Sequence, residues 1–429
     1  MDTFATFSEP ESDAPPSDAS SSLLYRDHPL YQKITRQLER LDRSGLALPF
    51  FMPHEGVNNG TTRIQGRELI NFSSYNYLGL SGHPGISAAA KEAIDRYGTS
   101  VSASRAVSGE IPLHRELEER LAAFIGVDDC MLYVGGHATN VSTIGHLMGE
   151  KDLILHDEHV HNSALEGCRL SGARRKAFRH NDTGHLERLL DKHAGRCRRV
   201  LILVEGVYSM EGDVVPLADM IHLKQRYGAW LMVDEAHSIG VLGMRGRGVA
   251  EHCKVNPRDV DIWMGTLSKA MASCGGYIAG DAALIRYLKQ TSPGFVYSVG
   301  MPPPNAAAAL AALGLIEDEP HRLGVLRERS QLFLTCAREH GLDTGRSAQT
   351  PIVPVITRDS ALALRMAAAL FRQGIHVSPI FYPAVKKKAA RLRFFVAAEH
   401  TEEQIRYAVD CTAKVYFHLM NEESEPCTS

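Results

Sequence analysis

Three neighbouring stretches decide the fold: VLILVE at residues 200–205, WLMVDEAH at 230–237 and GTLSK at 265–269. The first two begin with apolar runs rich in β-branched or bulky residues, which are typical of buried strands. Between them, Leu217–Tyr227 predicts a helix that ends at Gly228. Continuous apolar strands that alternate with helices predict an α/β fold with a parallel sheet covered on both faces.

The same alternation extends on both sides of this centre. Before it, the pattern predicts helices over 84–97, 113–125 and about 138–148, and a strand over 130–134; after it come strands over 261–265 and 275–279. Beyond Pro302–Pro304 the strands become sparser, with helices over 305–317, 323–340 and 360–373, strands at 352–356, 375–377 and 392–396, and a last helix opened by a capping box at Thr401–Gln404. This change predicts a second, smaller α/β domain at the C-terminus.

Composition excludes several classes of protein. The 429 residues carry 47 basic and 50 acidic side chains, a net charge of −3, which argues against a nucleic-acid partner. No apolar run approaches the roughly 20 residues of a spanning helix, and the N-terminus lacks the pattern of a signal peptide. The eight cysteines contain no CxxC pair, so we expect reduced thiols in a cytoplasmic protein and no structural zinc.

Residues able to do chemistry follow the predicted strands directly. They are Gly135-Gly136-His137, the histidines of 156–161, Ser209, Asp234–His237 and Thr266–Lys269. Because open α/β sheets bind ligands at the carboxyl ends of their strands, this placement favours a functional role for them.

A pyridoxal phosphate (PLP) site would use several of these residues. PLP needs a lysine, because only a primary amine forms the imine, and a carboxylate that keeps its pyridine nitrogen protonated. Its phosphate needs backbone N–H groups at a helix N-terminus, and a flat side chain stacks on its ring. The chain offers Lys269, Asp234, the Gly136–His137 turn and His161 for these tasks.

Taken singly, the same residues have plain structural interpretations. A lysine after a strand is usually solvated, and Asp234 could equally cap a helix or bind a metal. The stretch HDEHVH (156–161) resembles a metal cluster, but its alternating spacing is not a zinc signature, and we expect no metal. The glycines of 243–248 lack dinucleotide-loop spacing, and Lys386–Lys388 are most simply solvated. The residues alone leave PLP as one hypothesis among several.

Longer motifs narrow the choice. VDEAHSIGVLGMRGRG followed by GTLSKAMASCGGYIAG resembles the α-oxoamine synthases, which are fold-type I PLP enzymes. NYLGLSGHP, SGEIPLHRELE, VEGVYSMEGD, YSVGMPP and RLRFFVAAEHT extend the resemblance over about residues 25–420. It implies a large PLP domain with a mostly parallel seven-stranded sheet and a smaller C-terminal α/β domain. We expect a disordered segment at 1–22, an N-terminal segment at 23–75, the large domain at 76–304, the small domain at 305–420 and a flexible tail at 421–429.

The resemblance also assigns roles to individual residues. Lys269 would form the imine and act as the base at the substrate Cα, Asp234 would pair with the pyridine nitrogen, and His161 would stack on the ring. The other implied cofactor contacts are Ser209 and His237 near the phenolic oxygen, Gly136, His137 and Thr266 at the phosphate, and Ser298 and Gly300 from the partner of a homodimer. The implied substrate contacts are Arg393, for the amino-acid carboxylate, with Tyr75 and Asn76.

Four positions depart from the family pattern. The stacking histidine stands in Val160-His161-Asn162-Ser163 rather than Ser-His-Ala-Ser, Tyr75 replaces a common asparagine as in serine palmitoyltransferases, and Val299 replaces a common hydroxyl residue. The loop before Arg391 carries three lysines in place of Pro-x-Gly. These lysines leave open whether CoA or an acyl-carrier protein, as in secondary metabolism, delivers the acyl group.

The implied activity is a decarboxylative Claisen condensation. A small amino acid (glycine, alanine or serine) would react with an acyl thioester and give an α-amino ketone, CO2 and free thiol. The sequence does not identify the amino acid, the acyl chain or the pathway. Two alternatives are another fold-type I enzyme, such as an aminotransferase, and a non-catalytic subunit of a serine palmitoyltransferase-like complex, which would lack the lysine.

Overall fold

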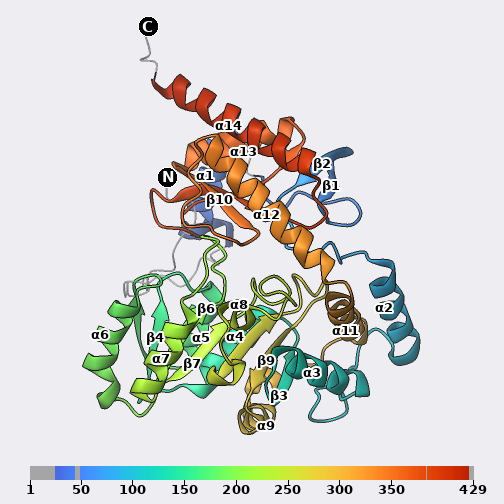
Figure 1. Ribbon diagram of the computed structural model, residues 1–429, viewed down its shortest axis with the longest axis vertical. Helices are drawn as coiled ribbons and strands as arrows, with labels where there is room; N and C mark the ends of the chain where they lie inside the picture. Colours follow the sequence, from blue (N-terminus) through green and yellow to red (C-terminus); the bar gives the residue numbers. More distant parts are fainter. Residues whose placement is uncertain (1–24, 44–48, 383, 425–429) are drawn as a thin grey trace.

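The structure is a computed structural model that describes residues 25–43, 49–382 and 384–424. It has a lower part built around a large sheet and an upper part with two small sheets (Figure 1). The segment expected to be disordered, 1–22, lies outside the described residues.

The large sheet has seven strands in the order β3-β9-β8-β7-β6-β4-β5. Only β9 is antiparallel to its neighbours, β3 and β8. The carboxyl ends of the other six strands therefore lie at one edge of the sheet. The strands are β3 (Asp129–Tyr133), β4 (Leu153–Asp157), β5 (Arg174–Phe178), β6 (Val200–Glu205), β7 (Trp230–Asp234), β8 (Ile262–Thr266) and β9 (Gly276–Gly280).

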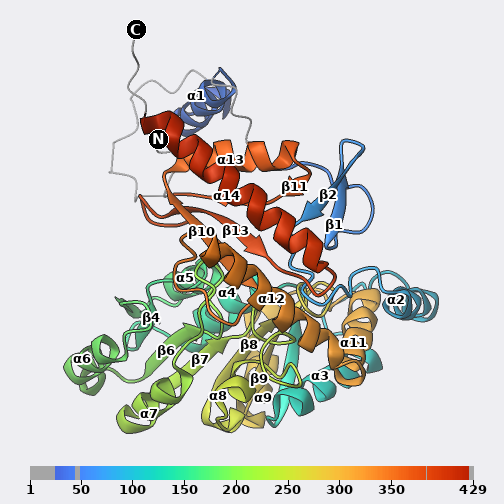
Figure 2. The ribbon, with the colours of Figure 1, turned by 45° about the horizontal axis from the view of Figure 1, so that its top comes forward.

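Helices cover both faces of this sheet (Figures 1 and 2). In the lower part they are α2 (Pro84–Tyr97), α3 (Pro112–Ile125), α4 (Gly136–Leu147), α5 (Asn162–Leu170), α6 (Thr183–His193), α7 (Leu217–Tyr227), α8 (Val249–Cys253), α9 (Ala282–Thr291), α10 (Pro293–Val296) and α11 (Pro303–Asp318), with 3-10 turns η2 (Ala194–Arg196) and η3 (Pro257–Asp259). Helix α7 ends at Gly228, whose φ of 60° is the left-handed conformation that glycine adopts at low cost.

Strand β6 shows why the central strands are apolar throughout. Alternate side chains of a strand point to opposite faces. Val204 belongs to the core that includes residues of α3, α7 and α11, whereas Leu203 belongs to the core that includes residues of α4, α5 and α9. Both faces are therefore buried, as the sequence pattern predicts.

The upper part combines both ends of the chain. Strands β1 (Thr61–Ile64) and β2 (Arg67–Asn71) form one sheet with β11 (Ile375–His376), and β10 (Ile352–Arg358), β13 (Ala390–Phe395) and β12 (Ser378–Ile380) form the other. The remaining elements are η1 (Tyr25–Asp27), α1 (Pro29–Arg43), α12 (His321–Glu339), α13 (Ser360–Arg372) and α14 (Glu402–Ser424). The predicted capping box before α14 is confirmed, because the Thr401 hydroxyl accepts the Gln404 N–H and the Gln404 amide oxygen accepts the Thr401 N–H.

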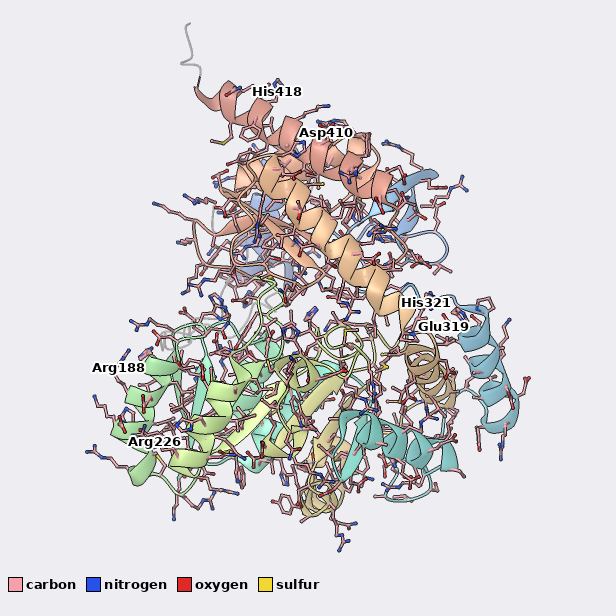
Figure 3. The ribbon with its side chains drawn as sticks, in the orientation of Figure 1. Arg188, Arg226, Glu319, His321, Asp410 and His418 are labelled. Carbon is pink, nitrogen blue, oxygen red and sulfur yellow. The ribbon has the colours of Figure 1, made fainter. Side chains whose placement is uncertain are left out.

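Packing differs from the expected segment bounds at two places. Helix α11 packs into the core of the lower part through Ala309 and Leu313, so that core extends beyond residue 304. Figure 3 shows Glu319 and His321 at the junction of α11 and α12, where the chain passes to the upper part. Helix α14 continues to Ser424, four residues into the expected tail. None of the helices in the described ranges has the length and apolar character needed to cross a membrane.

Candidate active site

Lys269 follows the end of β8, at the edge where the parallel strands end. Its amine lies 5.6 Å from the centre of the Tyr75 ring. Burial lowers the pKa of the Lys269 ammonium, although the carboxyl groups of Asp234 and Glu205 oppose this shift. A lysine with a lowered pKa is more often the free amine, which is the form that reacts with a carbonyl group.

Asp234 ends the adjacent strand β7, and its buried carboxylate is oriented by two donors. One oxygen accepts from the Asn140 side-chain amide at 2.8 Å, and the other accepts from the Ala236 backbone N–H at 2.9 Å. Asn140 also donates to the Ser163 hydroxyl at 3.0 Å, which links α4 to α5. Asp234 has no ion-pair partner among the described residues. Its negative charge is therefore available to a cationic ligand atom.

His161 caps the N-terminus of α5. Its Nδ1 accepts the Ser163 backbone N–H at 3.2 Å, and its own backbone N–H donates to the Glu205 carboxyl group. Burial lowers the pKa of His161, so the ring is neutral near pH 7. Since Nδ1 is an acceptor, Nε2 carries the proton of the neutral ring and is the side chain's donor.

His237 lies on the neighbouring loop, in a fully buried position. Its Nδ1 is 2.7 Å from the Tyr77 hydroxyl, and its ring is parallel to that of Phe395. Burial holds the pKa of His237 well below its ordinary value. The Tyr77 contact therefore fixes a neutral imidazole beside the lysine.

Arg393 reaches this edge from β13 of the upper part. Its guanidinium donates to the Ser209 carbonyl at 3.1 Å and lies 4.5 Å from the centre of the Phe395 ring. Burial lowers its pKa, its Nε has no hydrogen-bond partner, and no carboxylate pairs with it among the described residues. A buried cation without an ion partner is costly, so Arg393 is suited to bind the carboxylate of a substrate.

The start of α4 forms a cradle for an anion. The helix begins directly after Gly135, and no side chain caps it, so its first N–H groups are open to a ligand. A Cβ on Gly136 would lie 2.8 Å from the Thr266 hydroxyl oxygen, and only glycine permits this approach. The Thr266 hydroxyl is itself 2.7 Å from that of Ser268. His137, the second residue of α4, completes the predicted phosphate contacts.

The segment predicted to serve a partner subunit is folded onto its own chain. Ser104 and Val299 form an isolated β-bridge, and the Gly300 N–H donates to the Ala103 carbonyl at 3.1 Å. The Ser298 hydroxyl donates to the Val299 carbonyl. The Gly300 N–H is therefore already used within the chain, and the expected contact of Ser298 and Gly300 with a partner's phosphate stays a prediction.

The two residues expected near the substrate differ in their availability. Tyr75 is partly exposed, and its ring packs edge-on against Phe395 beside the lysine amine. Asn76 is buried: its amide nitrogen donates to Asn59, and its amide oxygen accepts the Ser81 N–H. The structure therefore brings Tyr75 into the site, whereas it uses the Asn76 side chain to hold a turn.

Several residues of the site escaped the sequence analysis. Glu205 pairs in register with Asp234, and burial holds the pKa of its carboxyl group well above the ordinary value. A signal was available, because VLILVE ends in an acid as WLMVD does. Asn140, by contrast, carries no pattern that distinguishes it from an ordinary polar residue. Tyr77 lies in the motif NYLGLSGHP, but nothing local indicates its contact with His237.

The histidines of HDEHVH separate in the structure. His156 bonds the Asp157 carbonyl, and His161 caps α5. Only Asp157 and His159 approach a third possible metal ligand, His180, with one ligand atom of each within 4.8 Å of the others.

Comparisons with known proteins agree with this geometry. A profile of the aminotransferase class I and II family matches residues 67–411. The 8-amino-7-oxononanoate synthase of Symbiobacterium thermophilum is 39% identical in sequence, and the match covers 89% of this chain and 97% of that enzyme. The 8-amino-7-oxononanoate synthase of Geobacter sulfurreducens is 41% identical, and the match covers 90% of this chain and 98% of that enzyme. The serine palmitoyltransferase structure of Sphingomonas wittichii has a TM-score of 0.86 at 30% identity, covering 94% of this chain and 100% of its own.

The residues present fit PLP. They provide the buried Lys269 and the oriented carboxylate of Asp234, which has no ion-pair partner among the described residues. They also provide the uncapped start of α4, where any residue larger than glycine at position 136 would crowd Thr266. A serine palmitoyltransferase structure that contains PLP has a TM-score of 0.86 at 28% identity, covering 91% of this chain and 98% of its own. The predicted fold type, family and cofactor are thus confirmed. The chain belongs to the aminotransferase class I and II family and, within it, to the α-oxoamine synthases, PLP-dependent acyltransferases that condense a small amino acid with an acyl thioester.

Proposed function

We propose that Lys269 is the residue that binds PLP covalently and moves the proton at the substrate Cα. The observation that carries this proposal is the position of its buried amine beside Tyr75, with Asp234 and Arg393 among the charges that set its pKa. When bound, PLP supplies an electron sink for the negative charge that develops at the Cα. General acid–base help of this kind is typically worth about 100- to 10,000-fold in rate.

The other proposed roles follow from charge and hydrogen bonding. Asp234 holds the proton on the pyridine nitrogen, and Asn140 keeps the carboxylate oriented. His161 stacks on the ring and offers its Nε2–H to the thioester carbonyl. Arg393 binds the amino-acid carboxylate. The remaining cofactor contacts are Gly136, His137 and Thr266 at the phosphate, and Ser209 and His237 near the phenolic oxygen.

Alanine is the amino acid we propose. The name 8-amino-7-oxononanoate describes a nine-carbon acid with a ketone at C7 and an amine at C8. A decarboxylative condensation joins C7 to C8, so the amino acid supplies C8, C9 and the nitrogen, as alanine does. The thioester then supplies C1–C7, a chain that ends in a carboxylate. Serine, which the name of the structural neighbours suggests, is the competing acceptor.

The assembly we propose is a cytoplasmic homodimer. Large apolar side chains are exposed on the two segments joined by the Ser104–Val299 bridge: Val107 is 84% exposed and Tyr297 is 86% exposed. Exposed apolar side chains of this size favour burial against a second copy. The described cysteines are all free thiols, which suits a reducing compartment. Light scattering of the wild type and of Tyr297→Glu tests the dimer, since the variant should be monomeric.

The first experiment is reconstitution with PLP, followed by absorption spectra. The wild type should give the visible band of lysine-bound PLP, and alanine should shift it more than glycine or serine does. Lys269→Ala should lose the band, whereas Lys91→Ala, at an exposed site on α2, should retain it. CO2 release is then compared with the acyl chain on CoA and on a carrier protein. A band that persists in Lys269→Ala refutes the assignment, and a larger shift with serine refutes alanine.

A further inference from the structure

His180 occupies a buried position between two carboxylates. It follows β5, and its side chain is only 4% exposed. Its Nδ1 lies 3.0 Å from an oxygen of Asp157, at the end of β4, and its Nε2 lies 2.8 Å from an oxygen of Asp213, in the turn after β6. The ring therefore joins two loops that leave the sheet at its carboxyl edge.

This geometry requires a protonated ring. A neutral imidazole has one N–H and one bare nitrogen, so it can donate to only one of two carboxylates. The two acidic partners outweigh burial and raise the pKa of His180 to about 9. The His159 ring stacks on His180 at 4.3 Å, and the Tyr208 ring meets it edge-on. The His180 side chain is thus an imidazolium that donates one N–H to Asp157 and the other to Asp213.

The first loop leads to the stacking histidine. Asp157 accepts the His159 backbone N–H at 2.8 Å, and the chain reaches His161 two residues later. Glu205 holds the His161 backbone N–H from the neighbouring strand. The position of the His161 ring therefore depends on where Asp157 is held.

The second loop contacts Arg393, the proposed substrate arginine, which lies on β13. Asp213 closes a tight turn, because its carbonyl accepts the Tyr208 N–H at 3.1 Å. Between these two residues, the carbonyl of Ser209 and the sulfur of Met210 contact the Arg393 guanidinium. A displacement of Asp213 would therefore reach the group that binds the amino-acid carboxylate.

We propose that His180 is a positioning residue, which holds the loop of His161 and the turn that contacts Arg393 at their working separation by one hydrogen bond to each. The proposal rests on the roles proposed for His161 and Arg393 above. Asn181 spans the same two carboxylates, because its backbone N–H donates to Asp157 at 2.8 Å and its side-chain amide donates to Asp213 at 3.2 Å. His180 supplies the two charged hydrogen bonds of this link, so losing either of them loosens the coupling between the two halves of the site. A divalent metal bound by Asp157, His159 and His180 would have to displace one of the two hydrogen bonds of the His180 ring. We therefore interpret His180, Asp157 and Asp213 as an ion triad.

The test compares His180→Gln and Asp213→Asn with Asp152→Asn. Asp152 is a fully buried carboxylate paired with Arg198 and Arg199 just before β4, at the opposite end of the strand from Asp157. It therefore controls for the loss of a buried, ion-paired carboxylate next to the same strand. For each variant we would measure PLP affinity, the visible circular dichroism of bound PLP, kcat, and KM for the amino acid.

We expect both triad variants to bind PLP but to show weaker visible dichroism, because the stacked ring is displaced. Per bound PLP, kcat should fall about 10- to 100-fold and KM should rise, as when a hydrogen bond to a charged group is lost. Asp152→Asn should keep both constants within about twofold. In His180→Ala, imidazole should restore activity, whereas 1-methylimidazole should not, since its cation has only one N–H.

Three results would overturn the proposal. One is kcat and KM unchanged in His180→Gln. Another is a loss of activity that matches the loss of folded, PLP-bound protein, which would make the role purely structural. The third is stoichiometric zinc in the wild type that His180→Gln releases. A wild type without any PLP band would instead refute the proposed function, and this proposal with it.

Discussion

Two adjacent glycines give a sharp test of the phosphate cradle. Replacing Gly136 by alanine puts a Cβ 2.8 Å from the Thr266 hydroxyl oxygen and 3.0 Å from its Cβ, and real Cβ contacts are not that short. The hydroxyl cannot simply turn away, because it lies between Ser268 and the Gly275 carbonyl. Overpacking of this kind costs about 1–3 kcal/mol. If the helix start moves to relieve the clash, PLP affinity falls about 5- to 150-fold.

Gly135→Ala is the matched control. Its Cβ would meet nothing within 4 Å, and its φ of −171° is extended backbone that alanine adopts. Titration of each apoprotein with PLP, followed by absorption, should show wild-type affinity for Gly135→Ala and weakened affinity for Gly136→Ala. Thr266→Ala in the Gly136→Ala background removes the clashing oxygen, so the double variant should bind PLP more tightly than the two single effects predict. Equal affinities in Gly136→Ala and Gly135→Ala would refute this account of the cradle.

Three further predictions concern the arginine, the histidine triad and the last helix. Arg393→Met should raise KM for the amino acid about 10- to 150-fold while PLP affinity stays unchanged, because it removes hydrogen bonds to a charged group; steady-state kinetics check this, and an unchanged KM contradicts it. The pKa of His180 is raised from 6.5 to about 9, so its contribution to stability is complete below about pH 6.5 and is lost as the pH rises through 9. The melting temperature of the wild type should therefore fall more steeply than that of His180→Gln between about pH 7 and 10. Parallel plots of melting temperature against pH for the two proteins would contradict a protonated His180. Thr401→Ala should cost about 0.5–2 kcal/mol in urea unfolding, since the Gln404 N–H loses its acceptor.

The elements that could be predicted are those whose pattern is local. Strand β6 and helix α7 have the predicted bounds, because an apolar run and a helix-ending glycine mark them. Strand β5 was missed, since its sequence RRKAF is mostly charged and its first four residues are exposed at the sheet edge. Strands β1 and β2 were missed because TTRI and RELIN are short and polar, and their sheet is completed only by β11.

The residues of the candidate site also differ in whether a local sequence pattern predicts them. Lys269 and Asp234 were predictable because each follows a recognisable strand, and parallel strands end at one edge. Tyr77 and His237 meet across 160 residues, and no local pattern encodes that contact. The hydrogen bond from the Gly300 N–H to the Ala103 carbonyl likewise depends on how the segment around Val299 folds back, and no local pattern predicts it.

The sheet of β1, β2 and β11 also has a consequence for synthesis of the chain. Asn71 of β2 and His376 of β11 are hydrogen-bonded across 305 residues. At a translation rate of about 5–20 residues per second, β2 leaves the ribosome roughly 15–60 s before its partner exists. The seven strands of the large sheet are all translated within that interval, so they can assemble first. Until β11 is made, the N-terminal hairpin exposes the unpaired edge of β2, and such an edge is a template for pairing with other chains.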